Sequence, residues 1–317
     1  MKKVTGNLSK EQKARNRRML WREIKKNRNL YLFIMPMIIW VIIFKYIPMP
    51  GILIAFEDYS YKKGIFESDW VGLKWFIQFF ESAEFWKTLK NTFGVTLRKL
   101  IIGFPIPIIF ALLLNEIKNS KFQKIVQTCT YLPHFVSWVI IVQLMRVVFT
   151  PYGGIVNSIR NAWGLGSIYF MGRKEYFYAL ILGSDIWAGT GWASIVYLAA
   201  IAGVDQSLYE AAMIDGANRL HRVWHITLPS ISTTIVLLLI MRMSSLMSAG
   251  VDQVLLLQSP ANLELSQVLD TYTLQVGLKY GKFELATAIG LVGSVVSLIC
   301  VWTVNNISRR ITEVSLW

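Results

Sequence analysis

The stretch Leu285 to Ser308, LATAIGLVGSVVSLICVWTVNNIS, contains no charged residue. About 20 mostly apolar residues in a helix are enough to cross the roughly 30 Å hydrocarbon core of a bilayer. A buried helix of a soluble protein is the alternative for one such stretch taken alone. The rest of the chain therefore has to decide between a membrane span and a core helix.

Five further stretches are long and apolar enough to cross a bilayer. They run from Leu30 to Phe56, Asn91 to Leu114, Ile125 to Phe149, Tyr176 to Val204 and Ile226 to Val251. The charged residue nearest the middle of the second stretch is Lys99, which we expect in the outer third of that span together with Arg98. Six such lengths in one chain favour an all-α integral membrane protein with six transmembrane helices.

The composition of the 317-residue chain agrees with this class. It is 54% apolar and 16% charged, whereas a typical soluble domain is roughly 45–50% apolar and about 25% charged. Its mean hydropathy of +0.44 also argues against a disordered chain. Cys129 and Cys300 both lie in apolar runs and His134, His221 and His225 lack metal-site spacing, so we expect no disulfide framework and no metal site.

The basic residues predict the orientation of the spans, because cytoplasmic loops are enriched in Lys and Arg. Eleven precede the first span and seven more lie in the other segments on that side, against ten in the longer opposite segments. Both termini are therefore expected in the cytoplasm, in a multi-pass protein of the cell (cytoplasmic) membrane. The predicted organisation is a basic segment over residues 1–29, one membrane domain over 30–308 and a short tail over 309–317.

The basic N-terminal segment admits two further interpretations. Residues Ala14 to Lys26 mix Trp21 and other apolar side chains with basic ones, which is typical of an interfacial helix on an anionic leaflet. A nucleic-acid-binding tail is the alternative. Since the topology already accounts for the positive charge, we expect no nucleic acid among the partners. The basic region is too long for a signal peptide and no small-residue cleavage site follows the first apolar run.

The segment between the fourth and fifth spans, residues 205–229, contains SLYEAAMIDGAN from Ser207 and ITLP from Ile226. Ser207 and Glu210 have the spacing of a capping box, in which each side chain satisfies a backbone N–H at a helix start. Gly216 permits a sharp turn, and Pro229 cannot continue a helix beyond its first turn. The pattern predicts a short helix, a bend and a second short helix on the cytoplasmic face. Plain turn and cap residues joining two spans are the alternative.

The same segment resembles the cytoplasmic-loop signature of binding-protein-dependent ABC importer permeases. That signature is Glu-Ala-Ala, three residues, Gly, nine residues and Ile-x-Leu-Pro. It stands here, with unchanged spacing, as Glu210, Ala211, Ala212, Gly216, Ile226, Leu228 and Pro229. By this resemblance the segment forms coupling helices that dock on an ATPase, with Asp215 and Ala217 inside the docking surface.

Three other stretches resemble the oligosaccharide (maltose-type) branch of the carbohydrate-uptake permeases. They are Lys45 to Tyr59, Trp70 to Leu73 and Tyr131 to Trp138. The resemblance implies an oligosaccharide substrate, a second permease subunit expected to be a different chain, an ABC ATPase dimer and an extracellular solute-binding protein. It also implies that ATP and Mg²⁺ bind to the partner ATPase and that this chain binds no cofactor.

The chain is not expected to carry its own ATPase. A phosphate-binding P-loop needs Gly, four residues and then Gly-Lys-Ser/Thr. Gly277 to Phe283, GLKYGKF, has three intervening residues and lacks the hydroxyl. We therefore expect a transport subunit without catalytic residues.

Polar and aromatic residues inside the spans are candidates for a substrate pathway, because charges there are costly and usually face a cavity or a partner. Sugar sites commonly combine flat aromatic faces with fixed polar groups. The candidates are Gln143, Arg146, Asp185, Trp187, Trp192, Tyr197 and Arg242. Asp185 is the expected partner of Arg242. The alternative for each residue is plain packing or ion pairing without contact to substrate.

Three other functions remain open on the sequence. An ABC importer for a non-sugar solute would carry the same loop. A polytopic membrane enzyme would need convergent carboxylates, a His cluster or a nucleophile with its base, and none is apparent. A secondary transporter would leave the cytoplasmic segment without a purpose.

Overall fold

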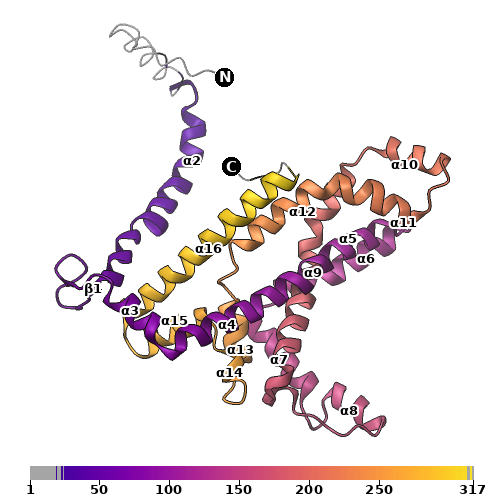
Figure 1. Ribbon diagram of the computed structural model, residues 1–317. Coiled ribbons are helices and arrows are strands. Elements are labelled where there is room, and N and C mark those ends of the chain that lie inside the picture. The colour runs from indigo at the N-terminus through magenta and orange to yellow at the C-terminus, as the bar shows by residue number, and fades with distance from the viewer. Residues whose placement is uncertain (1–18, 20–22, 24, 313–314, 316–317) are drawn as a thin grey trace. The chain divides into compact units, whose positions relative to one another are not determined.

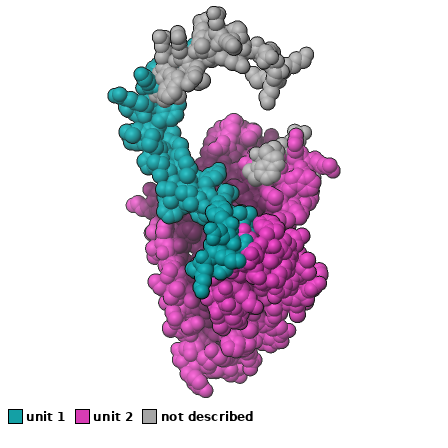
Figure 2. All heavy atoms as spheres, turned by 90° about the vertical axis from the view of Figure 1, so that its left-hand side faces the viewer, with its two compact units in different colours: residues 1–54, 60–68 teal, residues 55–59, 69–317 magenta. Residues whose placement is uncertain are grey.

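The computed structural model describes residues 19, 23, 25–312 and 315. Most of the predicted interfacial helix over residues 14–26, and residues 313–314 and 316–317 of the predicted tail over 309–317, lie outside these residues, and both stay predictions. The chain divides into two units, residues 1–54 with 60–68 and residues 55–59 with 69–317 (Figure 2).

The first unit is built around one long apolar helix. Its elements are α2 (Arg28–Val41), the π-helical segment η1 (Ile42–Tyr46) and most of the 3₁₀ segment η2 (Met49–Phe56). No side chain of α2 is buried within the chain, although the helix is strongly apolar. An apolar helix with no buried face is what a lipid-facing or partner-facing span requires.

The second unit is helical apart from one short antiparallel pair, in which Glu57 in β1 (Glu57–Asp58) pairs with Trp70 in β2 (Asp69–Trp70). Figure 1 shows α10 and α11 at one end of this unit and α8 and α14 at the opposite end. The helices and helical turns are α3 (Lys74–Glu81), α4 (Ala83–Arg98), η3 (Lys99–Gly103), α5 (Pro105–Asn115), α6 (Ser120–Tyr131), η4 (Leu132–Phe135), α7 (Trp138–Phe149), α8 (Ile155–Ala162), η5 (Phe170–Gly172), η6 (Lys174–Tyr176), α9 (Phe177–Ala202), α10 (Gln206–Ile214), α11 (Arg219–Arg222), η7 (Val223–Thr227), α12 (Leu228–Met243), α13 (Val251–Leu257), α14 (Leu263–Ser266), α15 (Leu269–Leu274), η8 (Gln275–Lys279) and α16 (Phe283–Thr312).

Five continuous helices in the described part of the chain are long and apolar enough to cross a membrane. They are Arg28–Phe56, Ala83–Asn115, Lys174–Ala202, Arg219–Met243 and Phe283–Arg310. They match five of the six predicted spans, with shifted ends. The mostly helical membrane fold is confirmed, whereas the orientation of the termini stays a prediction.

The third predicted span, over residues 125–149, is wrong as one continuous helix. Ser120–Phe135 and Trp138–Phe149 are both helical but meet at an angle of 106°. Pro133 lies in the 3₁₀ turn η4, and the backbone at Val136 and Ser137 is extended. A proline ring clashes with the preceding helical turn, so the chain turns here instead of continuing. The described residues contain six spans only if this bent pair counts as one.

The fifth predicted span is also wrong at its far end. The helix stops at Met243, and hydrogen-bonded turns follow, including Leu246 N–H to Met243 O and Ser248 N–H to Ser245 O. Three serines in the five residues from Ser244 compete for backbone groups and favour such turns. Arg242 therefore lies in the last turn of α12 and not in the middle of a span.

Three π-helical segments each end two residues before a proline. They precede Pro48, Pro105 and Pro229, which follow η1, η3 and η7 respectively. A proline within a helix removes one N–H donor and crowds the carbonyl four residues earlier. A widened π turn relieves that crowding without ending the helix. This is why Pro229 does not separate α11 from α12, contrary to the sequence prediction.

Two buried apolar clusters stabilise the second unit, one on each side of the polar residues described next. Val95 of α4 and Ile181 of α9 belong to one cluster. Ala111 of α5 and Tyr197 of α9 belong to the other. Because both clusters use the same two helices, the stretch between them on α4–α5 and α9 is fixed on both sides.

Candidate functional site

The loop at residues 205–229 begins with a capped helix, although the cap is not the predicted one. Asp205 is the N-cap of α10, and its carboxylate accepts a hydrogen bond of 2.9 Å from the Ser207 N–H. Ser207 and Glu210 therefore do not form a capping box, because the helix starts two residues earlier than predicted. The same hydrogen bond holds the pKa of Asp205 below its usual value.

The end of α10 has a two-bond cap that depends on Gly216. The Gly216 N–H donates to Met213 O at 3.2 Å, and the Ala217 N–H donates to Ala212 O at 2.9 Å. Gly216 has a φ of +78°. This pair of bonds is the Schellman motif, in which glycine takes the left-handed position at little cost. The predicted bend at Gly216 is therefore present.

The helix after the bend is not a separate short helix as predicted. Asn218 caps α11 by accepting from the His221 N–H at 2.8 Å, and α11 continues through η7 into α12. The Tyr209 hydroxyl lies 2.9 Å from that of Thr227, which ties α10 to η7. Ile226 packs against the cluster of Tyr197. The loop is thus a rigid extension of the helix that ends at Met243.

The surface of this loop is polar on one part and apolar on another. Glu210, Ala211 and Asp215 are exposed, whereas Ala212 and Ala217 are half-buried. Leu228 is half-buried and Pro229 is exposed. The sequence pattern gave no indication that five large apolar side chains of the loop are exposed. They are Leu208, Met213, Ile214, Leu220 and Trp224, of which Ile214 is 87% exposed. Exposed apolar side chains concentrated in one loop are typical of a protein contact.

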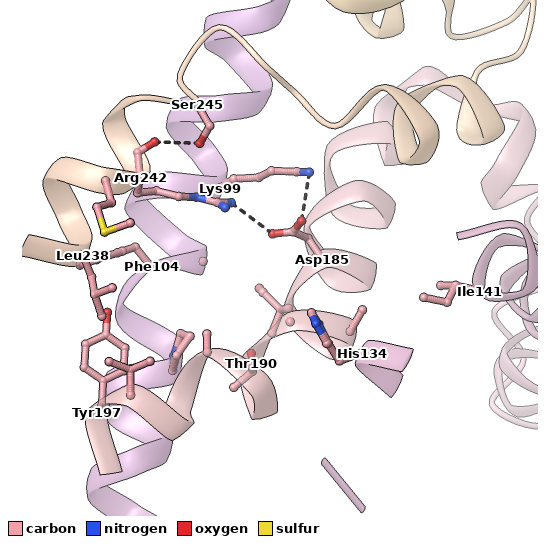
Figure 3. A pocket seen from close by; sticks show the side chains of 18 of the residues that line it. Lys99, Phe104, His134, Ile141, Asp185, Thr190, Tyr197, Leu238, Arg242 and Ser245 are labelled. Carbon is pink, nitrogen blue, oxygen red and sulfur yellow. Dashed lines mark hydrogen bonds and ion pairs between the residues drawn. The ribbon is translucent and has the colours of Figure 1, made fainter. Parts of the chain in front are cut away.

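A cavity of about 560 Å³ lies among α4–α5, α9, α12 and the bend between α6 and α7 (Figure 3). Small-molecule sites commonly have volumes of roughly 300–1,000 Å³. Its charged lining residues are Lys99, Asp185 and Arg242. Its aromatic lining residues include Trp138 and Tyr197.

The three charged residues meet at Asp185 (Figure 3). Lys99 Nζ lies 3.0 Å from Asp185 Oδ1, and Arg242 Nη2 lies 3.9 Å from Asp185 Oδ2. Lys99 also donates to Ala249 O at 3.0 Å and to the Gln253 side-chain oxygen. Gln253 in turn donates to Ile181 O and to the Ser184 hydroxyl, both at 2.8 Å.

The expected ion pair between Asp185 and Arg242 is therefore confirmed, but the stronger partner is Lys99. From its charge, Lys99 was expected in the outer third of its span. The side chain of Lys99 is only 8% exposed. No local pattern predicts this, because Ala249 and Gln253 lie about 150 residues further along the chain.

The other candidate pathway residues divide between two places. Tyr197 lines the cavity together with Asp185 and Arg242. Gln143, Arg146, Trp187 and Trp192 are not among the described residues that line it. Arg146 donates to Leu256 O at 3.3 Å, and Trp187 lines a separate apolar pocket beside α7. Trp192 stacks on the cavity residue His134, with ring centres 4.7 Å apart and planes at 2°.

Within the described residues no group of three His, Cys, Asp or Glu side chains could hold a metal ion. His221 and His225 stack at 4.0 Å, and the His225 ring bonds to the His221 carbonyl. Both of these histidines are thus occupied by local packing on the loop.

Comparison with known proteins places this arrangement in one family. Residues 103–313 match the family described as binding-protein-dependent transport system inner membrane component. The chain is 44% identical, over 96% of its length and 95% of the relative's, to the polygalacturonan/rhamnogalacturonan transport system permease protein YteP of Bacillus subtilis (strain 168). The chain belongs to the binding-protein-dependent permease family. It is therefore a membrane-spanning transport permease subunit, as predicted.

Solved structures of this permease family agree. The chain matches a bacterial ABC transporter involved in the import of the acidic polysaccharide alginate, with a TM-score of 0.85, 39% identity and coverage of 93% of this chain and 99% of the other. A second structure of the alginate transporter, in complex with a periplasmic protein that holds an alginate pentasaccharide, matches with a TM-score of 0.85 and 38% identity over 94% and 99% of the two chains. The fold is thus that of an ABC permease.

Proposed function

We propose that this chain is one of two permease subunits of an ATP-driven oligosaccharide importer. The relatives named for polygalacturonan and alginate support a saccharide substrate. One observation carries the proposal: a single helix from Arg219 to Met243 connects the exposed loop to the cavity. Arg219 starts that helix next to α10, and Arg242 lines the cavity in its last turn.

The proposed partners are a second permease of different sequence, an ABC ATPase dimer with its ATP and Mg²⁺, and an extracellular solute-binding protein. The alginate transporter, which was solved with a periplasmic protein, supports the last of these. The incomplete P-loop at Gly277–Phe283 supports a separate ATPase chain. Membrane lipid surrounds the spans, and α2 is one apolar surface that it or the second permease would cover.

The proposed orientation places both termini and the loop in the cytoplasm. The excess of basic residues on that side supports it. The separation of α10 and α11 from α8 and α14, at opposite ends of the second unit, is compatible with it (Figure 1).

The loop is proposed to dock on the ATPase through its apolar side chains. Ile214 is the last residue of α10 and packs against little in this chain. Met213 and Leu220 lie on either side of the Gly216 turn and are also exposed. Burial of an exposed aliphatic side chain contributes roughly 1.5–3 kcal/mol, so a groove on a partner would hold these residues firmly. Glu210, as the exposed polar residue, would contact the rim.

The test is to measure uptake and ATP hydrolysis together in the reconstituted complex. Ile214→Ser removes a side chain that this chain does not use, so its folding should be unchanged while transport per ATP falls several-fold. Gly216→Val strains the left-handed position and should uncouple or prevent assembly. Gly166→Val is the matched control, because Gly166 also has a positive φ, +68°, and open space around it, but follows α8 at the opposite end.

Glu210→Ala separates a docking contact from a purely local role. With Asp205 capping α10, loss of Glu210 costs little helix stability, so a sharp fall in uptake at unchanged protein level would place Glu210 at the ATPase. Unchanged uptake per ATP in Ile214→Ser, Gly216→Val and Glu210→Ala together would contradict the coupling role.

A further inference from the structure

The cavity holds more positive than negative charge. Its charged lining residues are the cations Lys99 and Arg242 and the single carboxylate Asp185. The imidazole of His134, which also lines the cavity, is stacked on Trp192. One full positive charge is therefore left without a partner of its own in the described part of the chain.

Lys99 and Asp185 already satisfy each other. Their side chains are 8% and 23% exposed and their charged atoms are 3.0 Å apart. The ammonium has three N–H donors, and Asp185, Ala249 O and Gln253 take all three. Lys99 thus has no donor left for a ligand, and its charge is neutralised by Asp185.

Arg242 is the cation that remains. Its side chain is 47% exposed, and its one ion pair is the 3.9 Å contact from Nη2 to Asp185, longer than a good charge-assisted hydrogen bond. A guanidinium has five donors in a planar fork. The Ser245 hydroxyl donates at 2.9 Å to the Arg242 carbonyl, which holds the last turn of α12 (Figure 3). The fork is therefore positioned on a fixed backbone and is largely unused.

A cation that shares its carboxylate with a second cation is incompletely neutralised, and such a charge inside a membrane protein is costly and usually marks a functional partner. We propose that Arg242 binds a carboxylate of the transported oligosaccharide, so that the substrate contains a uronate. A carboxylate accepts two parallel hydrogen bonds from a guanidinium, a geometry that a neutral sugar hydroxyl cannot match. Tyr197, Trp138 and Thr190 also line the cavity, so aromatic and hydroxyl groups are present for the rest of a sugar. The inference rests on the proposed transport of oligosaccharides.

The test uses the complete complex of both permeases and the ATPase, without the binding protein, so that only the pathway discriminates. Binding of trigalacturonate and of its neutral methyl ester is measured by calorimetry in detergent. We expect wild type to bind the acid at least about tenfold more tightly, the net worth of a hydrogen bond to a charged group being a factor of roughly 10 to 100. Arg242→Gln should abolish this ratio, and Arg242→Lys should retain part of it.

The matched control is Arg98→Gln. Arg98 is also an arginine of a membrane-spanning helix, but its guanidinium lies 3.9 Å from the Tyr178 ring centre and donates to Gly94 O, away from the cavity lining. The ratio of acid to ester should be unchanged in this variant.

Three results would overturn the inference. The first is an equal affinity of wild type for acid and ester, and the second is a ratio that survives in Arg242→Gln. The third is a complex that fails to assemble in Arg242→Gln but assembles in Arg242→Lys with the ratio lost, which would assign the carboxylate to the second permease. Uptake by the wild-type complex with its binding protein separates the two proposals. If no oligosaccharide is taken up, the proposed function fails; if uptake proceeds and the ratio ignores Arg242, only this inference fails.

Discussion

Replacing Lys99 by methionine tests the buried ion pair directly. The change keeps an unbranched side chain that is one atom shorter, but it removes the charge that faces Asp185 at 3.0 Å. It also leaves Ala249 O and the Gln253 side-chain oxygen without their donor. Breaking a buried pair from one side costs roughly 3–5 kcal/mol. Since Asp185 is 23% exposed and keeps Arg242 at 3.9 Å, we expect about 3 kcal/mol, the lower end of that range.

The free energy of unfolding is measured by titrating the purified chain from mild detergent into denaturing detergent and following helicity. The double variant Lys99→Met/Asp185→Leu removes both charges and should lose less than the sum of the two single variants, by at least about 1 kcal/mol. Lys174→Met is the control, because its ion pair with Glu264 is shorter, at 2.8 Å, but exposed to solvent. That variant should leave the unfolding free energy unchanged. Equal effects of Lys99→Met and Lys174→Met would refute the reasoning.

Three further outcomes are expected. Gly191→Ala should lower the unfolding free energy by roughly 1–3 kcal/mol or more, as overpacking does, because the new Cβ would overlap with the backbone carbonyl of Thr130, where helices α6 and α9 pack together. A neutral result would mean that this contact is loose. Burial raises the pKa of Asp270 above its ordinary 3.8, so the folded state holds the proton of this carboxyl more tightly than the unfolded state. Relative to Asp270→Asn, the wild type should therefore gain stability as the pH falls through the raised pKa towards 3.8 and lose it as the pH rises. A stability difference independent of pH would refute this. A reporter fused after Trp317 should read as cytoplasmic and one inserted near Lys62 as extracellular, and the opposite readings would invert the orientation.

The membrane class could be predicted from the sequence because hydrophobicity accumulates over about 20 residues and needs no knowledge of neighbours. The turn at Gly216 could be predicted for the same reason, since a glycine before a new cap is a local signal. Whether a helix continues past a proline could not be predicted. Pro133 and Pro229 look alike in the sequence, yet the chain bends by 106° at η4 and stays helical through η7. Which outcome a proline has depends on what packs against the widened turn.

The candidate cavity shows the same division between local and distant information. Asp185 and Arg242 could be named because charges inside apolar runs are conspicuous. The role of Lys99 could not, because its partners are distant in the sequence: Ala249 belongs to turns that were assigned to the end of a span, and Gln253 lies in α13 beyond that span. The exposed Ile214 was overlooked for the opposite reason: an apolar residue on a short helix is expected to face the core, and only the structure shows that no core lies beside it.

The helix from Arg219 to Met243 connects the two sites in a way that constrains any coupling between them. Its 25 residues correspond to about 38 Å at 1.5 Å per residue. The loop begins it at Asn218, and Arg242 faces the cavity one residue before it ends. A helix is stiff along its axis, so a displacement of α11 moves Arg242 unless the helix yields between them. The segment where it can yield is η7, where the π turn loosens the hydrogen bonds before Pro229. Thr227 is buried there and bonded to Tyr209 of α10, so η7 is braced by the loop itself. As long as the contact between Thr227 and Tyr209 holds, a movement of the loop is therefore expected to move Arg242 as well.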